Sequence, residues 1–169
     1  MIETERLTLR PLSEADFEAW ADFIGDSEAT RLLHTPDPVT DPERVRASLA
    51  RWIAIFDDPV GMYTLIVRET GETAGFVGFG PRDHPWGYEL ELGWLLRRAF
   101  WGRGYATAAA RALRPLVDGR VVSMIRVENA ASANVARKLG MTIEREVDDY
   151  HGYRTHLWSS DGRRSNRQA

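Results

Sequence analysis

The chain has 169 residues, of which 43% are hydrophobic, with a formal net charge of −3 at pH 7 and a pI near 5.8. This length is enough for one domain with a substantial core and too short for two, and the slightly negative charge argues against a nucleic-acid-binding surface. The sequence has no cysteine, which excludes disulfides, thiolate metal sites and a cysteine nucleophile.

The first part of the chain predicts a strand followed by helices. Residues 4–10 alternate around Leu7 and Leu9, and we expect Pro11 to end this strand. Residues 13–16 are typical of a helix cap, residues 28–33 predict a short helical turn, and residues 40–43 form a capping box that opens a longer helix. The apolar faces expected for the two main helices consist of Phe17, Trp20, Ala21 and Ile24 in the first and Val45, Leu49, Trp52, Ile53 and Phe56 in the second.

Strands dominate the middle of the chain. Residues 62–68 and 73–79 predict a hairpin with a polar turn, and residues 80–87 predict a loop. Apolar residues alternate with glutamate and glycine over residues 88–96, which predicts a strand. This strand leads into a glycine-rich turn, after which we expect a helix from Thr107 to about Val117 with its last turn broken by Pro115.

The last part of the chain predicts one more strand, a helix and a closing hairpin. Residues 121–127 predict a buried strand, Asn129 caps a helix through Leu139, and Gly140 ends it. The hairpin is expected from residues 141–147 and 153–158. Because the chain is polar without an apolar period from Ser159 onward, we predict a single domain over residues 1–159 and a disordered tail over residues 160–169.

The turn at residues 100–107, Phe-Trp-Gly-Arg-Gly-Tyr-Ala-Thr, has the composition of an anion site. Its glycines and small residues leave the backbone uncovered where a helix begins, so unpaired N–H groups and the positive end of the helix dipole face outward. Phosphate suits such a site. A dinucleotide fingerprint would need a third glycine where Thr107 stands, and the Gly-Lys-Ser/Thr triplet of nucleotide P-loops is absent from the sequence.

Three stretches of the chain resemble the GNAT superfamily of acyl-CoA-dependent N-acetyltransferases. Residues 101–106 are similar to its motif A, Gln/Arg-x-x-Gly-x-Gly/Ala, with Trp101 in place of the Gln/Arg. The ribosomal-protein N-acetyltransferase (Rim-type) subgroup commonly has an aromatic residue there. Residues 128–141 resemble motif B, and residues 4–10 resemble the first strand of that subgroup. The resemblance therefore spans most of the chain.

Periodicity alone predicts the α/β (α+β) class, a mixed sheet with helices on its faces. The resemblance implies the GNAT fold, in which that sheet is mostly antiparallel. In this fold the strands at residues 88–96 and 121–127 would splay apart and leave a slot for the pantetheine arm of acetyl-CoA.

The resemblance implies acetyl-CoA as co-substrate, with its pyrophosphate held by the backbone N–H groups of residues 102–107. It also implies that a backbone N–H near Trp94 or Leu95 stabilises the developing oxyanion. The cofactor-binding residues expected on this basis are Trp94, Leu95, Leu96, Gly102, Arg103, Gly104, Tyr105, Ala106, Thr107, Asn129 and Ser132.

An amine must lose a proton before it attacks a thioester, so the reaction calls for a base. Glu89 and Glu91 are two residues apart on one strand and therefore share a face. Many family members place a glutamate on this strand, and Glu91 matches it best. The alternative is that both glutamates only solvate an exposed strand face, and Asp148 and Asp149 are weaker candidates for the base.

Ser132 is the second catalytic candidate, because the resemblance places it near the leaving thiol. Some relatives carry a tyrosine acid further along this helix, but the matching residue here is Ala136, so that acid is absent or Ser132 substitutes for it. The alternatives are an ordinary helix serine for Ser132 and a simple helix cap for Asn129.

These features predict direct acetyl transfer from acetyl-CoA to a primary amine in a ternary complex, because no covalent nucleophile is evident. The acceptor is a protein N-terminus, an amino acid or a small-molecule amine. The competing hypotheses are a non-catalytic acyl-CoA-binding or sensing module on the same fold, and a nucleotide-binding regulator, for which the sequence lacks a phosphate loop.

The remaining expectations concern metals, partners and location. The four histidines show no metal-ligand spacing, so no metal site is predicted. The aromatic residues available to line a substrate pocket, or simply to fill the core, are Trp52, Trp86, Tyr150 and Tyr153. A charged N-terminus and the lack of a membrane-length apolar run predict neither signal peptide nor anchor. We expect a cytoplasmic monomer or homodimer that binds neither nucleic acid nor membrane.

Overall fold

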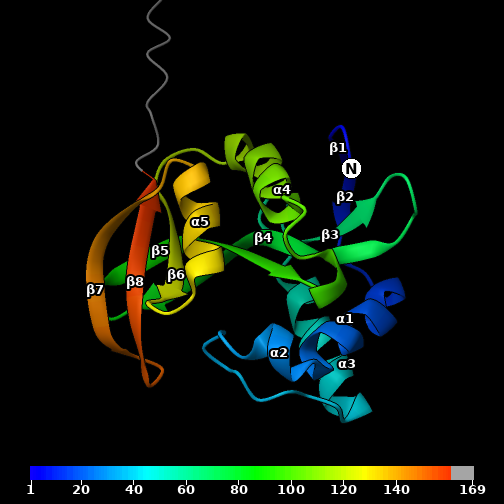
Figure 1. The fold of residues 1–169 in the computed structure, drawn as a ribbon, viewed down its shortest axis with the longest axis horizontal. Helices are drawn as coiled ribbons and strands as arrows, with labels where there is room; N and C mark the ends of the chain where they lie inside the picture. The colour runs from blue at the N-terminus through cyan, green and yellow to red at the C-terminus, as the bar shows by residue number, and fades with distance from the viewer. Residues whose placement is uncertain (161–169) are drawn as a thin grey trace, which may run out of the picture.

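The computed structural model describes residues 1–160, in which eight strands form one sheet in the order β1-β2-β3-β4-β5-β6-β8-β7 (Figure 1). The strands are β1 (Ile2–Glu3), β2 (Leu7–Pro11), β3 (Gly61–Val67), β4 (Thr73–His84), β5 (Gly87–Leu96), β6 (Val121–Arg126), β7 (Thr142–Tyr150) and β8 (Tyr153–Ser160). Neighbouring strands are antiparallel except β5 and β6, which are parallel. The predicted mixed, mostly antiparallel sheet is confirmed.

Helices cover both faces of this sheet. They are α1 (Phe17–Gly25), α2 (Ser27–Thr30), α3 (Pro42–Ala54), α4 (Tyr105–Leu113) and α5 (Ala130–Lys138), with short 3-10 turns at Glu14–Asp16, Arg98–Phe100 and Arg114–Leu116. Figure 1 shows α1, α2 and α3 below the sheet and α4 and α5 above it. As predicted, the helix is broken near Pro115: α4 ends at Leu113 and a 3-10 turn over Arg114–Leu116 follows it. Asn129 caps α5, its Oδ1 accepting from the N–H of Ser132 at 3.1 Å.

Each face of the sheet has its own core. Above the sheet, the buried side chains of α4, including Leu113, pack on those of the strands. The strand residues of this core include Leu9, Leu65, Phe79 and Leu92. Below it, the predicted faces of α1 and α3 bury Trp20, Ile24, Val45 and Leu49 together with Phe23 and Phe76, while Phe17, Ala21, Trp52 and Ile53 are partly buried. The amphipathic patterns of the two helices therefore direct the correct sides inward, except at Phe56, which lies beyond the end of α3 and packs with the core above the sheet.

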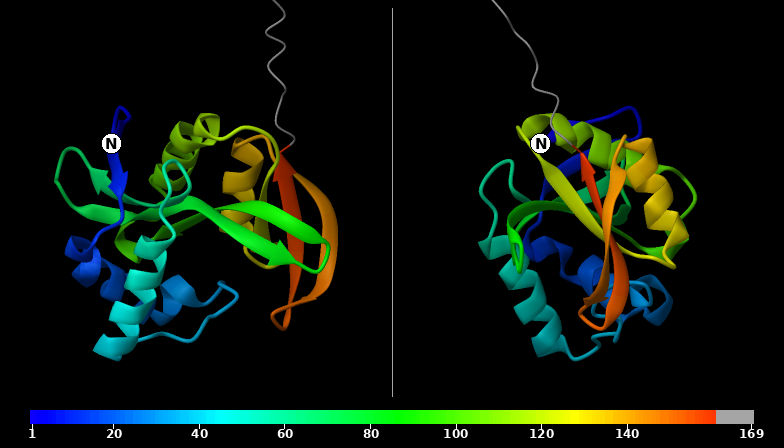
Figure 2. Two further views of the ribbon diagram at one scale, coloured as in Figure 1. Left: turned by 180° about the vertical axis from the view of Figure 1, so that it is seen from behind. Right: turned by 90° about the vertical axis from the view of Figure 1, so that its left-hand side faces the viewer.

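A long β4–β5 hairpin replaces the loop predicted over residues 80–87. Only Pro85 and Trp86 form the turn between the two strands. Because β3 pairs with β4 only as far as Phe79, β4 has a free edge beyond that residue, where Pro81 needs no ladder hydrogen bond. Figure 2 shows the hairpin from behind as a ribbon that reaches β8 and β7. The indole of Trp86 packs there on a cluster of Val122, Met124 and Leu157.

Two further strand boundaries differ from the prediction. The first long strand begins at Leu7, because the N–H of Thr4 donates to the carbonyl of Leu7 at 2.8 Å and closes a turn. At the other end, Ser160 belongs to β8 and pairs with Val121, so the predicted tail is wrong at this residue. The rest of the predicted tail lies outside the described residues.

The sheet divides between β5 and β6. Across residues 1–160, these two strands share a single registered pair, Glu91 with Val122. One residue further along β6, the buried hydroxyl of Ser123 donates to the carbonyl of Leu92 at 2.7 Å. Beyond this point the strands diverge, which confirms the predicted splay and opens a space between β5 and α5.

Candidate active site

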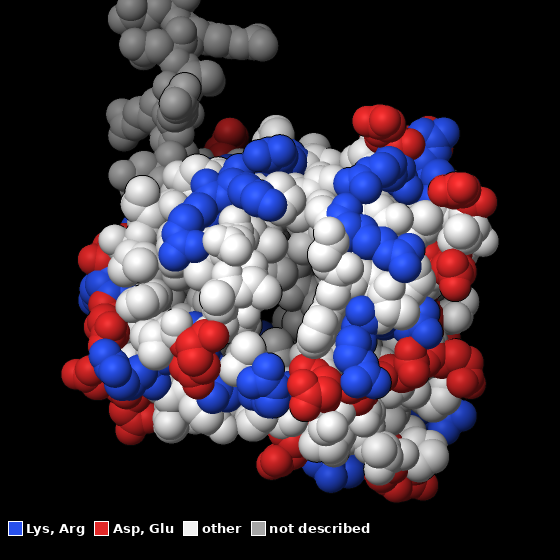
Figure 3. All heavy atoms as spheres, in the orientation of Figure 1, with Lys and Arg blue, Asp and Glu red and all other residues white. Residues whose placement is uncertain are grey.

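A groove of about 420 Å³ occupies the opening between β5 and α5. The residues that line it include Trp94, Leu95 and Leu96 of β5, Gly102, Gly104, Tyr105, Ala106 and Thr107 of the turn into α4, and Asn129 and Ser132 at the start of α5. Every predicted cofactor-binding residue except Arg103 therefore lies on one groove. Figure 3 shows the hollow with Lys and Arg side chains gathered on both sides of its upper part.

The turn into α4 presents the start of that helix to the groove. Gly102 and Gly104 adopt positive φ angles of 73° and 77°, which glycine tolerates and side-chain-bearing residues rarely do. Gly104 is the N-cap of α4, and the N–H of Ala108 donates to its carbonyl at 3.0 Å. The N–H groups of residues 105–107 consequently have no acceptor within the helix. Together with the positive end of the helix dipole, they form the anion site that the sequence predicts.

Arginines flank this turn without covering it. The guanidinium of Arg103 lies 5.4 Å from the centre of the Phe100 ring, away from the groove. That of Arg6 lies 5.0 Å from the centre of the Tyr105 ring, and one of its nitrogens would be 3.4 Å from a Cβ atom added at Gly104. Arg6 is thus a cation beside the exposed helix start that the sequence analysis, which points to Arg103, does not identify.

Two indole groups fix the backbone and side chains around the groove. Trp101, at the variant position of motif A, donates its Nε1–H to the carbonyl of Leu96 at 2.9 Å and ties the turn to the end of β5. Trp94 reaches across the opening and donates its Nε1–H to the Ser132 hydroxyl at 3.3 Å. A hydroxyl has one proton and two lone pairs, so Ser132 keeps its proton free to donate elsewhere.

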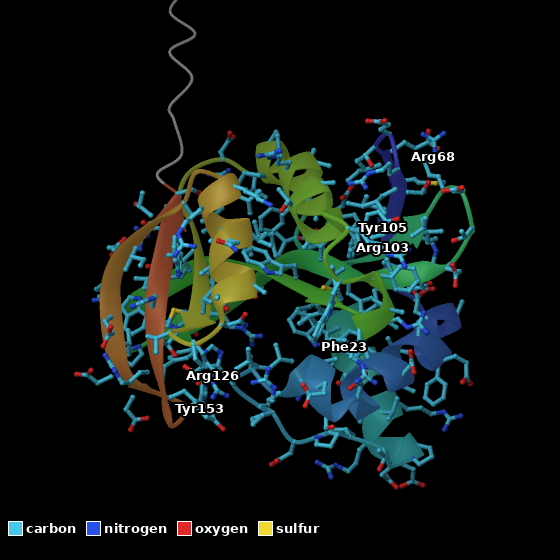
Figure 4. The ribbon with its side chains drawn as sticks, viewed as in Figure 1. Phe23, Arg68, Arg103, Tyr105, Arg126 and Tyr153 are labelled. Atoms are coloured by element: carbon cyan, nitrogen blue, oxygen red, sulfur yellow. The ribbon has the colours of Figure 1, made fainter. Side chains whose placement is uncertain are left out.

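One wall of the groove was not predicted. It comes from α1 and α2 and the loop after them, through Phe23, Glu28, Ala29, Arg31, Leu32 and Leu33. Arg126 of β6 holds this loop by donating to the carbonyls of Arg31 and Leu33, both at 3.2 Å, and its guanidinium lies over the ring of Tyr153 at 3.7 Å (Figure 4). No local sequence pattern predicts this wall, because it depends on a contact between segments about 95 residues apart.

Apart from Trp101, the other unpredicted lining residues belong to α5, where Lys138 is the one cation. Helical spacing offers the signal that identifies it, since Ser132, Val135 and Lys138 recur at intervals of three on the face toward the groove. Ala136, four residues after Ser132, is fully buried and packs with Ile125, Met141 and Trp158.

A second, smaller cavity of about 140 Å³ lies on the α3 side of the sheet. It is lined by Trp52, Met62, Gly78, Gly80, Arg82, Glu91, Gly93 and Leu95. A Cβ atom added at Gly93 would meet nothing within 4 Å, so the missing side chain of Gly93 is part of the open space. Leu95 lines both cavities, so the groove and the Glu91 cavity adjoin at the same stretch of β5.

Glu91 is mostly buried in this second cavity, with 22% of its side chain exposed. Burial raises its pKa, and the nearby Arg82 guanidinium and the backbone N–H of Met124 oppose that rise without cancelling it. A carboxylate with a raised pKa is a better proton acceptor at neutral pH than one in water. Glu89 is also buried, but Arg120 binds it at 3.0 Å. The two glutamates therefore do not solvate an exposed strand face.

The other predicted candidates lie elsewhere. Asp148 and Asp149 are exposed on β7 and line neither cavity. His84 is buried on β4 and stacks on Trp86 at 4.6 Å, although the sequence places it in a loop. Within residues 1–160, no cluster of three or more side chains suited to a metal ion is present. Over the same residues, each helix is too short or too polar to span a membrane.

The match of the sequence to a family decides the class of this protein. A model of the acetyltransferase (GNAT) domain matches residues 6–142. The chain belongs to the GNAT acetyltransferase family. It is 29% identical to an uncharacterised N-acetyltransferase, p20, of Bacillus licheniformis over 153 residues, which are 87% of this chain and 85% of that protein. An acetyltransferase structure from Agrobacterium tumefaciens is 33% identical, with a TM-score of 0.73 over 94% of this chain and 92% of the other.

Another structural neighbour is RimL, a ribosomal L7/L12 alpha-N-protein acetyltransferase in complex with coenzyme A. It is 24% identical, with a TM-score of 0.78 over 94% of this chain and 95% of the other, which shows a shared fold. The predicted GNAT fold and the likeness to the Rim-type subgroup are confirmed. The protein is an N-acetyltransferase of a family that uses acetyl-CoA and an amine acceptor.

Proposed function

We propose that this GNAT enzyme binds acetyl-CoA in the groove and transfers the acetyl group directly to a primary amine held in the Glu91 cavity. The observation that carries the proposal is the shared residue Leu95, which puts the two cavities next to each other at one segment of β5. A thioester in the groove and an amine in the cavity would then meet at the opening of the sheet. Such juxtaposition is a large part of what an enzyme contributes to a two-substrate reaction.

The groove supports the cofactor part of the proposal at two points. The unpaired N–H groups of residues 105–107, with Arg6 beside them, suit the pyrophosphate of acetyl-CoA. Toward the other end, the exposed backbone of Trp94 and Leu95, left without a β6 partner, suits the amide groups of the pantetheine arm. A backbone N–H in the same stretch would stabilise the negative charge that develops on the carbonyl oxygen.

The second cavity supplies the proton acceptor. Glu91 would take the proton from the ammonium group of the acceptor, and the neutral nitrogen would attack the thioester carbon that acetyl-CoA provides. As the carbon–sulfur bond breaks, the Ser132 hydroxyl would donate a hydrogen bond to the thiolate. A thiol has a pKa of about 8.5, so this leaving group needs little further help. The cytoplasmic location and the oligomeric state predicted from the sequence stay predictions.

The test measures acetyl-CoA binding by calorimetry and thiol release with a panel of primary amines. We expect micromolar-to-millimolar binding and amine-dependent release of thiol. The variant Gly93→Val tests the acceptor cavity without changing the groove. A valine suits a strand, and its side chain would fill only the acceptor space. It should raise KM for the amine and leave acetyl-CoA affinity within a few-fold. Binding without release for any amine would instead favour the non-catalytic module.

A further inference from the structure

Arg82 stands beside Glu91 at the wall of the acceptor cavity. Its Nε atom lies 3.7 Å from Oε2 of Glu91, and 49% of the Arg82 side chain is exposed against 22% for Glu91. Its guanidinium also lies 5.5 Å from the centre of the Trp52 ring, which helps to hold it over the cavity. The cavity thus presents one carboxylate and one guanidinium side by side, between apolar and glycine walls.

The guanidinium of Arg82 has donors to spare. A separation of 3.7 Å is an ion pair and is too long for a hydrogen bond. An arginine carries five N–H donors, and the Arg82 side chain donates no hydrogen bond to another side chain or carbonyl among residues 1–160. Among the described residues, Arg82 is the one Lys or Arg that lines this cavity, and the nearby Arg120 is paired with Glu89 and Glu144. Arg82 is therefore the cation that a ligand in this cavity can reach.

We propose that the acceptor is a free α-amino acid, with its amine on Glu91 and its carboxylate on Arg82. This rests on the proposed function and names its substrate class. The ammonium and carboxylate groups of an α-amino acid are attached to one carbon, so they can pair with two opposite charges that lie next to each other. Because the Arg82–Glu91 pair is neutral as a whole, a zwitterion leaves no buried charge without a partner.

The size and charge of the cavity argue against the other acceptors. At about 140 Å³ it is well below the roughly 300–1,000 Å³ that encloses a drug-sized molecule, and the open space beside Gly93 suits a short side chain. A polyamine or aminoglycoside would bring a second ammonium group toward Arg82, where like charges repel. A peptide N-terminus offers Arg82 a neutral carbonyl, a weaker partner than a carboxylate.

The proposed reaction balances without a further reactant. Glu91 accepts one proton from the ammonium group and later returns it to solvent, the nitrogen–carbon bond forms as the carbon–sulfur bond breaks, and the second proton that the nitrogen loses balances the one that the thiolate takes up. The carboxylate of the amino acid remains bound to Arg82 and unchanged. Arg82 is in this sense a specificity-determining residue, since it contacts the substrate and takes no part in the proton transfers.

The test compares each α-amino acid with the amine that lacks only its carboxylate. The pairs are L-alanine with ethylamine, L-leucine with isoamylamine and L-phenylalanine with phenethylamine, each measured as kcat/KM with acetyl-CoA. Wild type should prefer at least one amino acid over its amine by about 10–100-fold, the effect of a hydrogen bond to a charged group. Arg82→Met should reduce that ratio to near one. Arg46→Met is the matched control, because Arg46 lies 4.6 Å from the centre of the Phe17 ring and lines neither cavity.

The ratio isolates the carboxylate, because any effect of Arg82 on the basicity of Glu91 acts on both members of a pair. Equal kcat/KM within every pair in wild type would overturn the inference, and so would an equal loss for both members in Arg82→Met. A preference for the dipeptide L-Ala-Gly or for spermidine over every amino acid would overturn it too. In those cases acetyl transfer itself is intact, whereas a lack of thiol release with every amine tested would mean that the proposed function fails.

Discussion

The hydroxyl of Ser123 on β6 donates to the carbonyl of Leu92 on β5 at 2.7 Å, at the point where the sheet divides. Ser123 is buried, with 2% of its surface exposed. The side chain of Ser123 thus satisfies a carbonyl whose usual partner, the next rung of the sheet, is lost to the splay. This bond sets where the strands part, and therefore where the groove begins.

We predict that Ser123→Ala loosens this junction. It leaves the buried Leu92 carbonyl without a donor, which costs about 1–3 kcal/mol in the free energy of unfolding, and it should also weaken acetyl-CoA binding. Ser48→Ala is the matched control, because it removes the acceptor of the Trp20 indole at 3.3 Å and neither residue lines the groove. Chemical denaturation and calorimetry check both variants. If both lose stability equally and neither loses affinity, the Ser123 bond serves stability alone.

Gly104→Val should abolish acetyl-CoA binding. A valine at a φ of 77° is strained by about 1–2 kcal/mol, and relief of that strain would rotate the N–H groups at the start of α4. Gly71→Val has the same strain at a φ of 72°, with open space around it, in the β3–β4 turn. Both variants should melt at lower temperature than wild type. Only Gly104→Val should lose the rise in melting temperature that acetyl-CoA produces. If Gly104→Val still binds acetyl-CoA, the anion site is not at this turn.

Glu91→Gln should lower kcat/KM by about 10²–10⁴-fold near neutral pH. Because burial raises the pKa of Glu91, its basic form accumulates as pH rises through that higher value, and wild-type activity should increase over the same range. The glutamine variant lacks this increase. Its deficit should narrow at high pH, where the amine deprotonates unaided. Glu89→Gln is the control on the same strand, since Arg120 already binds Glu89. Parallel pH profiles for wild type and Glu91→Gln would remove Glu91 as the base.

Local patterns predicted the parts of the site that local chemistry determines. The glycine turn requires positive φ at Gly102 and Gly104, and the Asn129 cap depends only on the first turn of α5. Both features can therefore be predicted from a few consecutive residues. The splay itself came from the resemblance to the GNAT family. Periodicity in β5 and β6 does not contain it, because β5 alternates along its length and β6 is a continuous buried run, and neither pattern marks the point where the strands part.

The parts that sequence reasoning missed depend on contacts between distant segments. Arg82 lay in a predicted loop, because two prolines normally interrupt a strand, yet β4 tolerates Pro81 where its neighbour β3 has ended. The sequence therefore did not predict that Arg82 pairs with Glu91. The wall of the groove made by α2 similarly depends on Arg126, whose hydrogen bonds to the carbonyls of Arg31 and Leu33 no spacing in the sequence announces.

The last prediction concerns the contact between Trp94 and Ser132. Because the Trp94 indole donates to the Ser132 hydroxyl at 3.3 Å, it occupies one lone pair and orients the remaining proton. If that proton is directed at the departing thiolate, Ser132→Ala should remove about 0.5–1.5 kcal/mol of transition-state stabilisation, or roughly tenfold or less in kcat. Acetyl-CoA affinity should stay within a few-fold of wild type.

Trp94→Phe keeps an aromatic ring in the groove and removes only the indole donor. We expect a smaller fall in kcat than for Ser132→Ala, and we expect that fall to vanish when both substitutions are combined. A residue that acts through another adds nothing once the other is gone, which a double-mutant cycle measures directly. Pre-steady-state kinetics on the four proteins isolates the chemical step. Additive losses would mean that Trp94 acts on the thioester independently, and a thousand-fold loss in Ser132→Ala would mean that Ser132 is a true general acid.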